Sequence, residues 1–157
     1  MKHRTTAERK GERELVITRT LDGPARLVFK AWTTPELLQQ WWTPKSTGAR
    51  LIGCEIDLRT GGSYRYTFAH PSREEPLAFF GKYLEVVPDA KIVWTNEESD
   101  DGAVSTLTLV ETDGRTLLTI SEIYPTSEAV DAALEGAAEG MPEQFEQLDA
   151  LLVTLGA

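Results

Sequence analysis

The pattern of hydrophobic and polar positions is clearest near the end of the chain. From residue 127 to residue 155, the apolar side chains recur every three or four residues, at Val130, Leu134, Ala137, Met141, Phe145, Leu148, Leu152 and Leu155. This spacing lines them along one face of a helix. Burying such a face stabilises a fold by roughly 1.5–3 kcal/mol for each large side chain. The pattern therefore predicts one long amphipathic helix that needs a surface to cover it.

The middle of this helix carries residues that oppose a helical backbone. Gly136 and Gly140 have low helix propensity, and Pro142 lacks an amide proton. The ring of Pro142 would also clash with the carbonyl group of Ala138. We therefore expect a break or kink near Pro142, after which the helix resumes from about residue 143.

The preceding segments read mostly as short strands. Apolar and polar residues alternate over residues 14–21, 49–58 and 63–68, and further strands are predicted over residues 77–87 and 92–96 and on both sides of Asp113-Gly114. In residues 49–58 the alternation places Ile52, Cys54 and Ile56 on the apolar face. Gly81 interrupts its strand and suggests a bulge or bend, and Asp113-Gly114 is a strong hairpin signal.

Two short helices follow the first strand. Pro24 marks the start of one, with an apolar face that ends at Trp32, and Pro35 starts another that ends before Pro44. We predict an α+β fold in which a curved, seven-stranded antiparallel sheet wraps around the long C-terminal helix. The domain is expected to span residues 14–157 as a single unit, and residues 1–13 are polar enough to predict a flexible N-terminal tail.

Composition narrows the classes of protein. The 157 residues, 41% of them hydrophobic, suffice for one domain with a core, and no apolar run is long enough to span a membrane. The charged N-terminus has no apolar stretch typical of a signal peptide, so we expect a cytoplasmic protein that does not bind membranes. The single cysteine excludes an internal disulfide and fits a reducing compartment. Residues 92–157 contain one basic residue against fourteen acidic ones, which argues against nucleic-acid binding.

Residues that could carry catalysis or bind metal are few. His3 lies in the predicted tail and His70 in a loop, and Cys54 alternates with apolar neighbours, so none resembles a catalytic group. The acidic loop with Glu97, Glu98, Asp100 and Asp101 could attract a hard cation, but it lacks the ligand spacing of a calcium loop. We expect no metal, no cofactor and no assigned catalytic residue.

Aromatic residues are the positive signal for function. Those on the predicted strands and on the helix can form a concave, apolar wall with a few hydroxyl groups, as in a ligand pocket. Glu122 shares the parity of apolar neighbours on its strand, so it points either into this hollow or to solvent at its rim. The predicted ligand-binding residues are Tyr64, Tyr66, Phe68, Phe79, Tyr83, Trp94, Glu122, Met141 and Phe145. The alternative is a filled core. Trp32, Trp41 and Trp42 are expected to pack the short helices instead.

Several of these segments also resemble a known family. They are residues 19–33, the Trp41-Trp42 pair with Pro44, the Asp57-Leu58-Arg59-x-Gly61-Gly62 motif, residues 81–88 and residues 139–149. Together they resemble the family of activators of heat-shock protein ATPase homologues, within the START-like (SRPBCC) superfamily. The resemblance implies the helix-grip fold. The sequence departs from many relatives at Met141-Pro142, where they carry Gly-Trp.

The resemblance implies three functions. Other branches of the superfamily bind apolar ligands between helix and sheet, so a small hydrophobic molecule is the expected partner. The family's eukaryotic namesake stimulates a chaperone ATPase, so a protein-interaction module is the alternative. A polyketide-cyclase-like enzyme is the third reading and depends on Glu122 and the tyrosines. A monomer and a homodimer are both compatible with the sequence.

Overall fold

The computed structural model describes residues 5–97 and 102–156. Its strands are Thr6–Lys10 (β1), Glu14–Leu21 (β2), Arg50–Ile56 (β3), Ser63–Ala69 (β4), Leu77–Val87 (β5), Lys91–Thr95 (β6), Val104–Thr112 (β7) and Arg115–Ile123 (β8). The helices are Ala25–Thr33 (α1), Pro35–Trp41 (α2) and Ser127–Gly156 (α3), with a short 3₁₀ turn at Lys45–Thr47 (η1). The predicted α+β class, the two short helices and the long final helix are confirmed.

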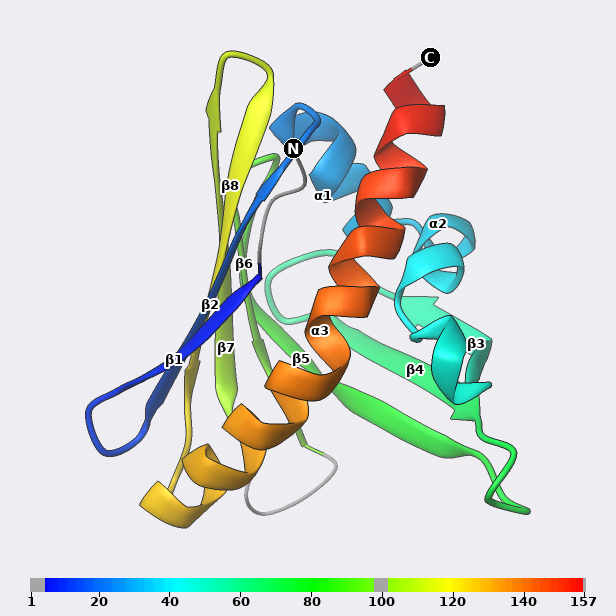
Figure 1. Cartoon of the computed structure of the whole chain (residues 1–157), viewed down its shortest axis with the longest axis vertical. Helices are drawn as coiled ribbons and strands as arrows, with labels where there is room; N and C mark the ends of the chain where they lie inside the picture. The colour runs from blue at the N-terminus through cyan, green and yellow to red at the C-terminus, as the bar shows by residue number, and fades with distance from the viewer. Residues whose placement is uncertain (1–4, 98–101, 157) are drawn as a thin grey trace.

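All eight strands form one antiparallel sheet in the order β1-β2-β8-β7-β6-β5-β4-β3. The long strand β5 turns the sheet, because its first half pairs with β4 and its second half with β6. Gly81 lies at this change of partner, where an added Cβ would stand 2.0 Å from the carbonyl oxygen of Thr95. Only glycine fits so close an approach. Figure 1 shows the result, two arms of sheet with α3 lying in the angle between them.

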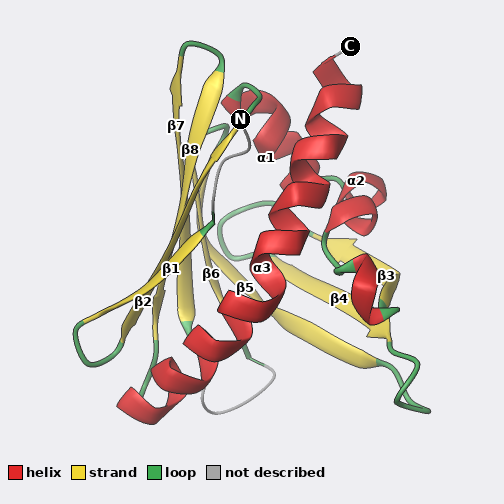
Figure 2. Cartoon of the chain, in the orientation of Figure 1, coloured by secondary structure: helices red, strands yellow, loops and turns green. Residues whose placement is uncertain are grey.

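Helix α3 packs against β1 and β2 on one side and against α1 and α2 on the other. Figure 2 shows the helices together on the concave side of the sheet. The apolar face predicted for α3 is the buried one, since Val130, Phe145, Leu148 and Leu152 are almost fully covered. The expected contact between helix and curved sheet is confirmed, and this arrangement is a helix grip.

A buried ion pair joins α3 to the sheet. Arg19 on β2 is 4% exposed and donates two hydrogen bonds to Oδ2 of Asp149, at 3.2 and 2.6 Å. The other carboxylate oxygen of Asp149 accepts a hydrogen bond from the backbone N–H of Asp22 at 3.2 Å. Because both charges are largely withdrawn from water, this pair fixes the position of α3 along the sheet.

Two predictions about the backbone are wrong. Residues 6–10 do not form a flexible tail but the strand β1, which pairs with β2 from Thr6 opposite Thr18 to Lys10 opposite Glu14. This strand brings the sheet to eight strands instead of seven. Its charged side chains show no apolar alternation because it lies at the edge of the sheet. Gly11, in the left-handed region at φ 77°, makes the turn that starts β2.

We predicted a break or a kink at Pro142, and the break is absent, because α3 is continuous from Ser127 to Gly156. A proline inside a helix costs about 3 kcal/mol. Phe145, Leu148 and Leu152, which follow it, are all at most 2% exposed, and burying three such side chains offsets that cost. Packing therefore decides the course of the helix here, and local propensity does not.

The predicted face of β3 needs one correction as well. Ile52 is 48% exposed, whereas its neighbour Leu51 is buried. The register with β4 shifts between Leu51 and Gly53, so one residue is added and the alternation reverses. Cys54 and Ile56, after the bulge, return to the side of the core.

Candidate functional site

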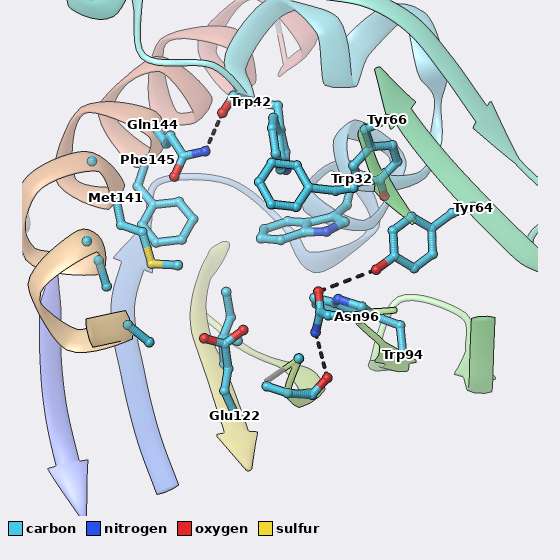
Figure 3. A pocket seen from close by; sticks show the side chains of 18 of the residues that line it. Trp32, Trp42, Tyr64, Tyr66, Trp94, Asn96, Glu122, Met141, Gln144 and Phe145 are labelled. Carbon is cyan, nitrogen blue, oxygen red and sulfur yellow. Dashed lines mark hydrogen bonds between the residues drawn. The ribbon is translucent and has the colours of Figure 1, made fainter. Parts of the chain in front are cut away.

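A cavity of about 420 Å³ lies between α3 and the concave face of the sheet (Figure 3). Its described walls come from the short helices, the sheet and α3: Trp32, Trp41, Trp42, Tyr64, Tyr66, Phe79, Trp94, Asn96, Gly102, Ala103, Ile120, Glu122, Tyr124, Ala133, Gly136, Ala137, Gly140, Met141, Gln144 and Phe145. This volume falls in the range of small-molecule sites. The core of the protein is therefore not filled at this place.

Seven of the nine predicted site residues line the cavity, namely Tyr64, Tyr66, Phe79, Trp94, Glu122, Met141 and Phe145. The other two do not. Phe68 stacks on Phe79 with ring centroids 5.3 Å apart, behind the wall. Tyr83 is 4% exposed and packs against Tyr64 at 5.5 Å. That the seven contact a ligand stays a prediction.

The cavity has an aromatic end that the sequence did not predict. Trp32 from α1, with Trp41 and Trp42 from the end of α2, lines the wall in addition to packing the helices. Trp32 lies 4.7 Å from Trp41 and 6.3 Å from Phe145, centroid to centroid. Trp42 contacts Phe79 edge-on at 5.1 Å. The short helices close this end of the cavity, so the apolar faces of these helices contribute rings to the cavity wall.

Small residues on α3 leave the space open. Ala133, Gly136, Ala137 and Gly140 all line the cavity, and an added Cβ at either glycine would meet nothing within 4 Å. Gly136 and Ala137 lie three and four residues after Ala133, and Gly140 lies three residues after Ala137, so all four residues share one face of the helix. Gly136 and Gly140 have low helix propensity, and their lack of a side chain leaves room for the cavity.

A chain of hydrogen bonds crosses the opposite wall. Nδ2 of Asn96 donates to Oγ of Ser105 at 3.0 Å, and that hydroxyl donates to Oε2 of Glu122 at 2.8 Å. The hydroxyl of Tyr124 donates to the other oxygen of Glu122 at 3.0 Å. The hydroxyl of Tyr64 lies 3.4 Å from Oδ1 of Asn96 and donates to the carbonyl of Thr95 at 2.7 Å. Nδ2 of Asn96 also donates to the carbonyl oxygen of Ala103 at 2.8 Å, so Asn96 links Ala103 to the hydrogen bonds that end on Glu122.

Glu122 therefore points into the hollow and is not a group at the solvent rim. It is half-buried on β8 opposite Ser105 of β7, which is fully buried. Figure 3 shows its side chain reaching toward the middle of the cavity, with Asn96 on one side and Met141 on the other. The parity of its strand left the hollow and the rim both open. The residues bonded to its carboxyl group are Ser105 on the neighbouring strand β7 and Tyr124, directly after β8.

The buried hydroxyl and thiol groups near the cavity are kept neutral. Burial raises the pKa of Tyr66 well above its usual value and raises that of Tyr83 to about 12. Burial, with help from Glu36 and Glu55, also raises the pKa of Cys54 to about 11. A thiol with so high a pKa is a poor nucleophile at neutral pH. Cys54 is thus a core residue, as predicted.

Other candidate groups form no second site among the described residues. His70 is bonded to Ser72 in its own loop, with the backbone N–H of Ser72 3.1 Å from Nδ1. Within the described chain, no three His, Cys, Asp or Glu side chains gather to hold a metal ion, and no helix is long and apolar enough to cross a membrane. His3 and most of the acidic loop (Glu98, Asp100 and Asp101) lie outside the described residues.

The antiparallel sheet around a C-terminal helix, with a hollow between them, defines a START-like domain of the helix-grip class. The sequence model described as "Activator of Hsp90 ATPase homolog 1-like protein" matches residues 22–153. The chain belongs to this family. No curated protein sequence matches it.

Solved structures agree with this assignment. A protein from Nitrosomonas europaea is similar at 26% identity and a TM-score of 0.83, over 94% of this chain and 99% of that one. A protein from Rhodobacter sphaeroides has 24% identity and a TM-score of 0.87, over 96% and 99%. An AHSA1-like protein from Aeromonas hydrophila has 17% identity and a TM-score of 0.71, over 90% and 94%. At these last two identities the likeness concerns the fold alone.

Proposed function

We propose that this protein binds a small, largely apolar molecule in the cavity between α3 and the sheet. The observation that carries the proposal is the cavity of about 420 Å³ between α3 and the concave face of the sheet, which is partly open to solvent. Protein interiors are close-packed, and space left empty costs stability in proportion to its volume. A stripe of small residues on α3 that keeps this space open therefore favours a role in binding.

The rings at the closed end of the cavity indicate the shape of the ligand. Trp32, Trp42 and Phe79 come from three different elements and all face the cavity. Aromatic rings prefer offset-stacked or edge-to-face contacts, which add about 0.5–1.5 kcal/mol per pair beyond the burial of area. A flat, ring-containing molecule would use such contacts better than a flexible alkyl chain would.

A protein-interaction module of the chaperone-activator type would need a continuous apolar surface. On strands β7 and β8 the exposed apolar residues form separate pairs, in which Val104 lies opposite Ile123 and Val110 lies opposite Leu117. Between these pairs the facing residues carry hydroxyl groups: Thr106, Thr108, Thr119 and Ser121. Strands β3 and β5 carry further exposed apolar residues: Ile52, Leu77, Leu84 and Val87. The cavity therefore supports ligand binding better than this surface supports a protein partner.

A cyclase-like enzyme is the other alternative, and Glu122 meets its first condition because it faces the cavity. Catalysis also calls for a second group that can act as a base, an acid or a nucleophile. The described lining contains no His, Lys, Cys or Ser. Its hydroxyl groups are those of Tyr64, Tyr66 and Tyr124: Tyr64 donates to the carbonyl of Thr95, Tyr124 donates to Glu122, and burial raises the pKa of Tyr66. We therefore propose binding in preference to a reaction.

Titration with N-phenylnaphthylamine, an uncharged dye that fluoresces in apolar surroundings, tests the proposal. We expect a saturable rise in fluorescence with the native protein. The variant Gly140→Leu should lose it, because the new side chain would enter the cavity. Ala138→Leu is the matched control, since Ala138 is exposed on the same helix and does not line the cavity.

The comparison of the two leucine variants decides the outcome. Both add an apolar side chain to α3, so a general effect on the helix would change both alike. If the native protein does not bind the dye, or if Gly140→Leu binds it as well as Ala138→Leu does, the cavity is not a binding site and the proposal fails.

A further inference from the structure

The described lining of the cavity contains an acidic side chain and no basic one. Of the described residues that line it, Glu122 is the one with a carboxyl group, and there is no Lys, Arg or His among them. The remaining lining is aromatic, aliphatic or amide. A molecule that enters the cavity therefore meets a single acidic side chain in largely apolar surroundings, where electrostatic interactions are stronger than in water.

The hydrogen bonds around Glu122 hold it as an acceptor. Ser105 donates to one carboxylate oxygen at 2.8 Å and Tyr124 to the other at 3.0 Å. Asn96 in turn donates to Ser105, so the chain runs in one direction and ends on the carboxylate. Two acceptor oxygens are what an ionised carboxylate presents. Hydrogen bonds to the charged form stabilise it.

Aromatic rings surround this carboxyl group on the other sides of the cavity. The lining includes three tryptophans from the short helices, Trp94 from β6 and Tyr64 from β4. Figure 3 shows the rings of Trp32 and Phe145 across the cavity from the strand that carries Glu122. The faces of aromatic rings are negative and attract cations, whereas they repel anions.

From these observations we infer that the ligand of this cavity is an organic cation, a ring-containing amine whose ammonium group contacts Glu122. The inference rests on the proposed binding function and adds the charge of the ligand. It excludes fatty acids and other carboxylates, because an anion would be placed beside Glu122 in a site without a basic side chain in its described lining. A charge-assisted hydrogen bond to the carboxylate would supply the preference.

Three molecules with the same ring system test the inference: naphthylmethylamine, a cation at neutral pH, naphthalenemethanol, which is neutral, and naphthoate, an anion. Each is measured by displacement of N-phenylnaphthylamine from the native protein. We expect the amine to bind about tenfold or more tightly than the alcohol, as for a hydrogen bond between charged groups. Naphthoate should bind more weakly than the alcohol.

The variant Glu122→Gln keeps the shape of the side chain and removes its charge. In this variant the amine should bind no better than the alcohol. Glu135→Gln is the matched control, because Glu135 is exposed on α3, does not line the cavity and changes the net charge of the protein equally. The melting temperatures of both variants show whether they fold.

The outcomes separate the two proposals. If the dye binds but the native protein does not prefer the amine to the alcohol, the inference about charge is wrong and the binding function stands. If the preference for the amine survives in Glu122→Gln, the inference is wrong as well. If the dye and all three molecules fail to bind, the binding function fails and the inference fails with it.

Discussion

The two halves of helix α3 do different work, although they belong to one continuous helix. The second half, residues 143–156, carries large side chains such as Phe145, Leu148 and Leu152, all at most 2% exposed. The first half, residues 127–141, presents Gly136 and Gly140 to the cavity. The second half therefore mostly fills the core, although Gln144 and Phe145 at its start also line the cavity, and the first half leaves most of the open space.

The two halves of α3 also differ in the polar contacts they make with the rest of the protein. In the second half, the side chain of Gln147 donates to the carbonyl oxygens of Trp41 at 2.9 Å and Thr43 at 2.8 Å, and accepts from the backbone N–H of Lys45 at 2.9 Å. These bonds join the helix to the chain that leaves α2. In the first half, the ion pair of Asp131 with Arg9 lies at the surface. Different turns of α3 therefore hold the helix to the rest of the fold and line the cavity.

The largest effect is expected from Phe145→Ala, which would place a small residue in the second half of α3, as in the first half. Phe145 is 2% exposed and packs against Trp32 and Trp41. Removing it should lower the free energy of unfolding by about 3–5 kcal/mol, because it leaves a void in a packed region. Urea denaturation followed by circular dichroism measures this loss. Val153→Ala, at a residue 66% exposed on the same half, should change it by less than about 0.5 kcal/mol.

The next effect comes from the ion pairs. Asp149→Asn would leave the buried guanidinium of Arg19 without its charged partner, so unfolding should become easier by about 3 kcal/mol. Asp131→Asn removes the same charge from the first half, where the Asp131 side chain is 66% exposed, and should cost less than about 1 kcal/mol. Equal losses in the two denaturation curves would contradict the division of the helix into an anchoring half and a binding half.

The smallest effect has the opposite sign. Gly140→Ala should stabilise the protein by about 1 kcal/mol, because alanine has a higher helix propensity and its methyl group would enter open space. At Gly62, by contrast, an added Cβ would stand 2.1 Å from the carbonyl oxygen of Asp57, so Gly62→Ala should destabilise. Thermal denaturation of the two variants measures both signs. A loss of stability in Gly140→Ala would show that this part of the helix has no room.

Much of the fold could be predicted because burial and periodicity agree along most of the chain. The apolar stripe of α3 and the alternation of β2 each place their buried residues correctly. Strand β1 could not be predicted this way, because its five residues form hydrogen bonds to β2 without an apolar face. The continuity of α3 through Pro142 was equally hidden, since it depends on packing with distant segments.

The candidate site was partly predictable for a similar reason. Strand parity placed Tyr64 and Tyr66 toward the hollow and allowed this direction for Glu122, and all three line the cavity. Tyr83 has the same inward direction but lies beyond the open volume, which depends on the size of the residues around it. The tryptophans of the short helices could not be assigned, because a helix face that packs against the core and one that lines a cavity have the same sequence pattern.

Strand β1 has a consequence for how copies of this protein meet. It forms one outer edge of the sheet, it is only five residues long, and Glu8, Arg9 and Lys10 carry charges along it. Short, charged edges discourage the addition of strands from other molecules. Without it, the eight-residue β2, with the more apolar sequence ELVITRTL, would become the edge. Strand β1 thus disfavours aggregation through edge-to-edge pairing of sheets.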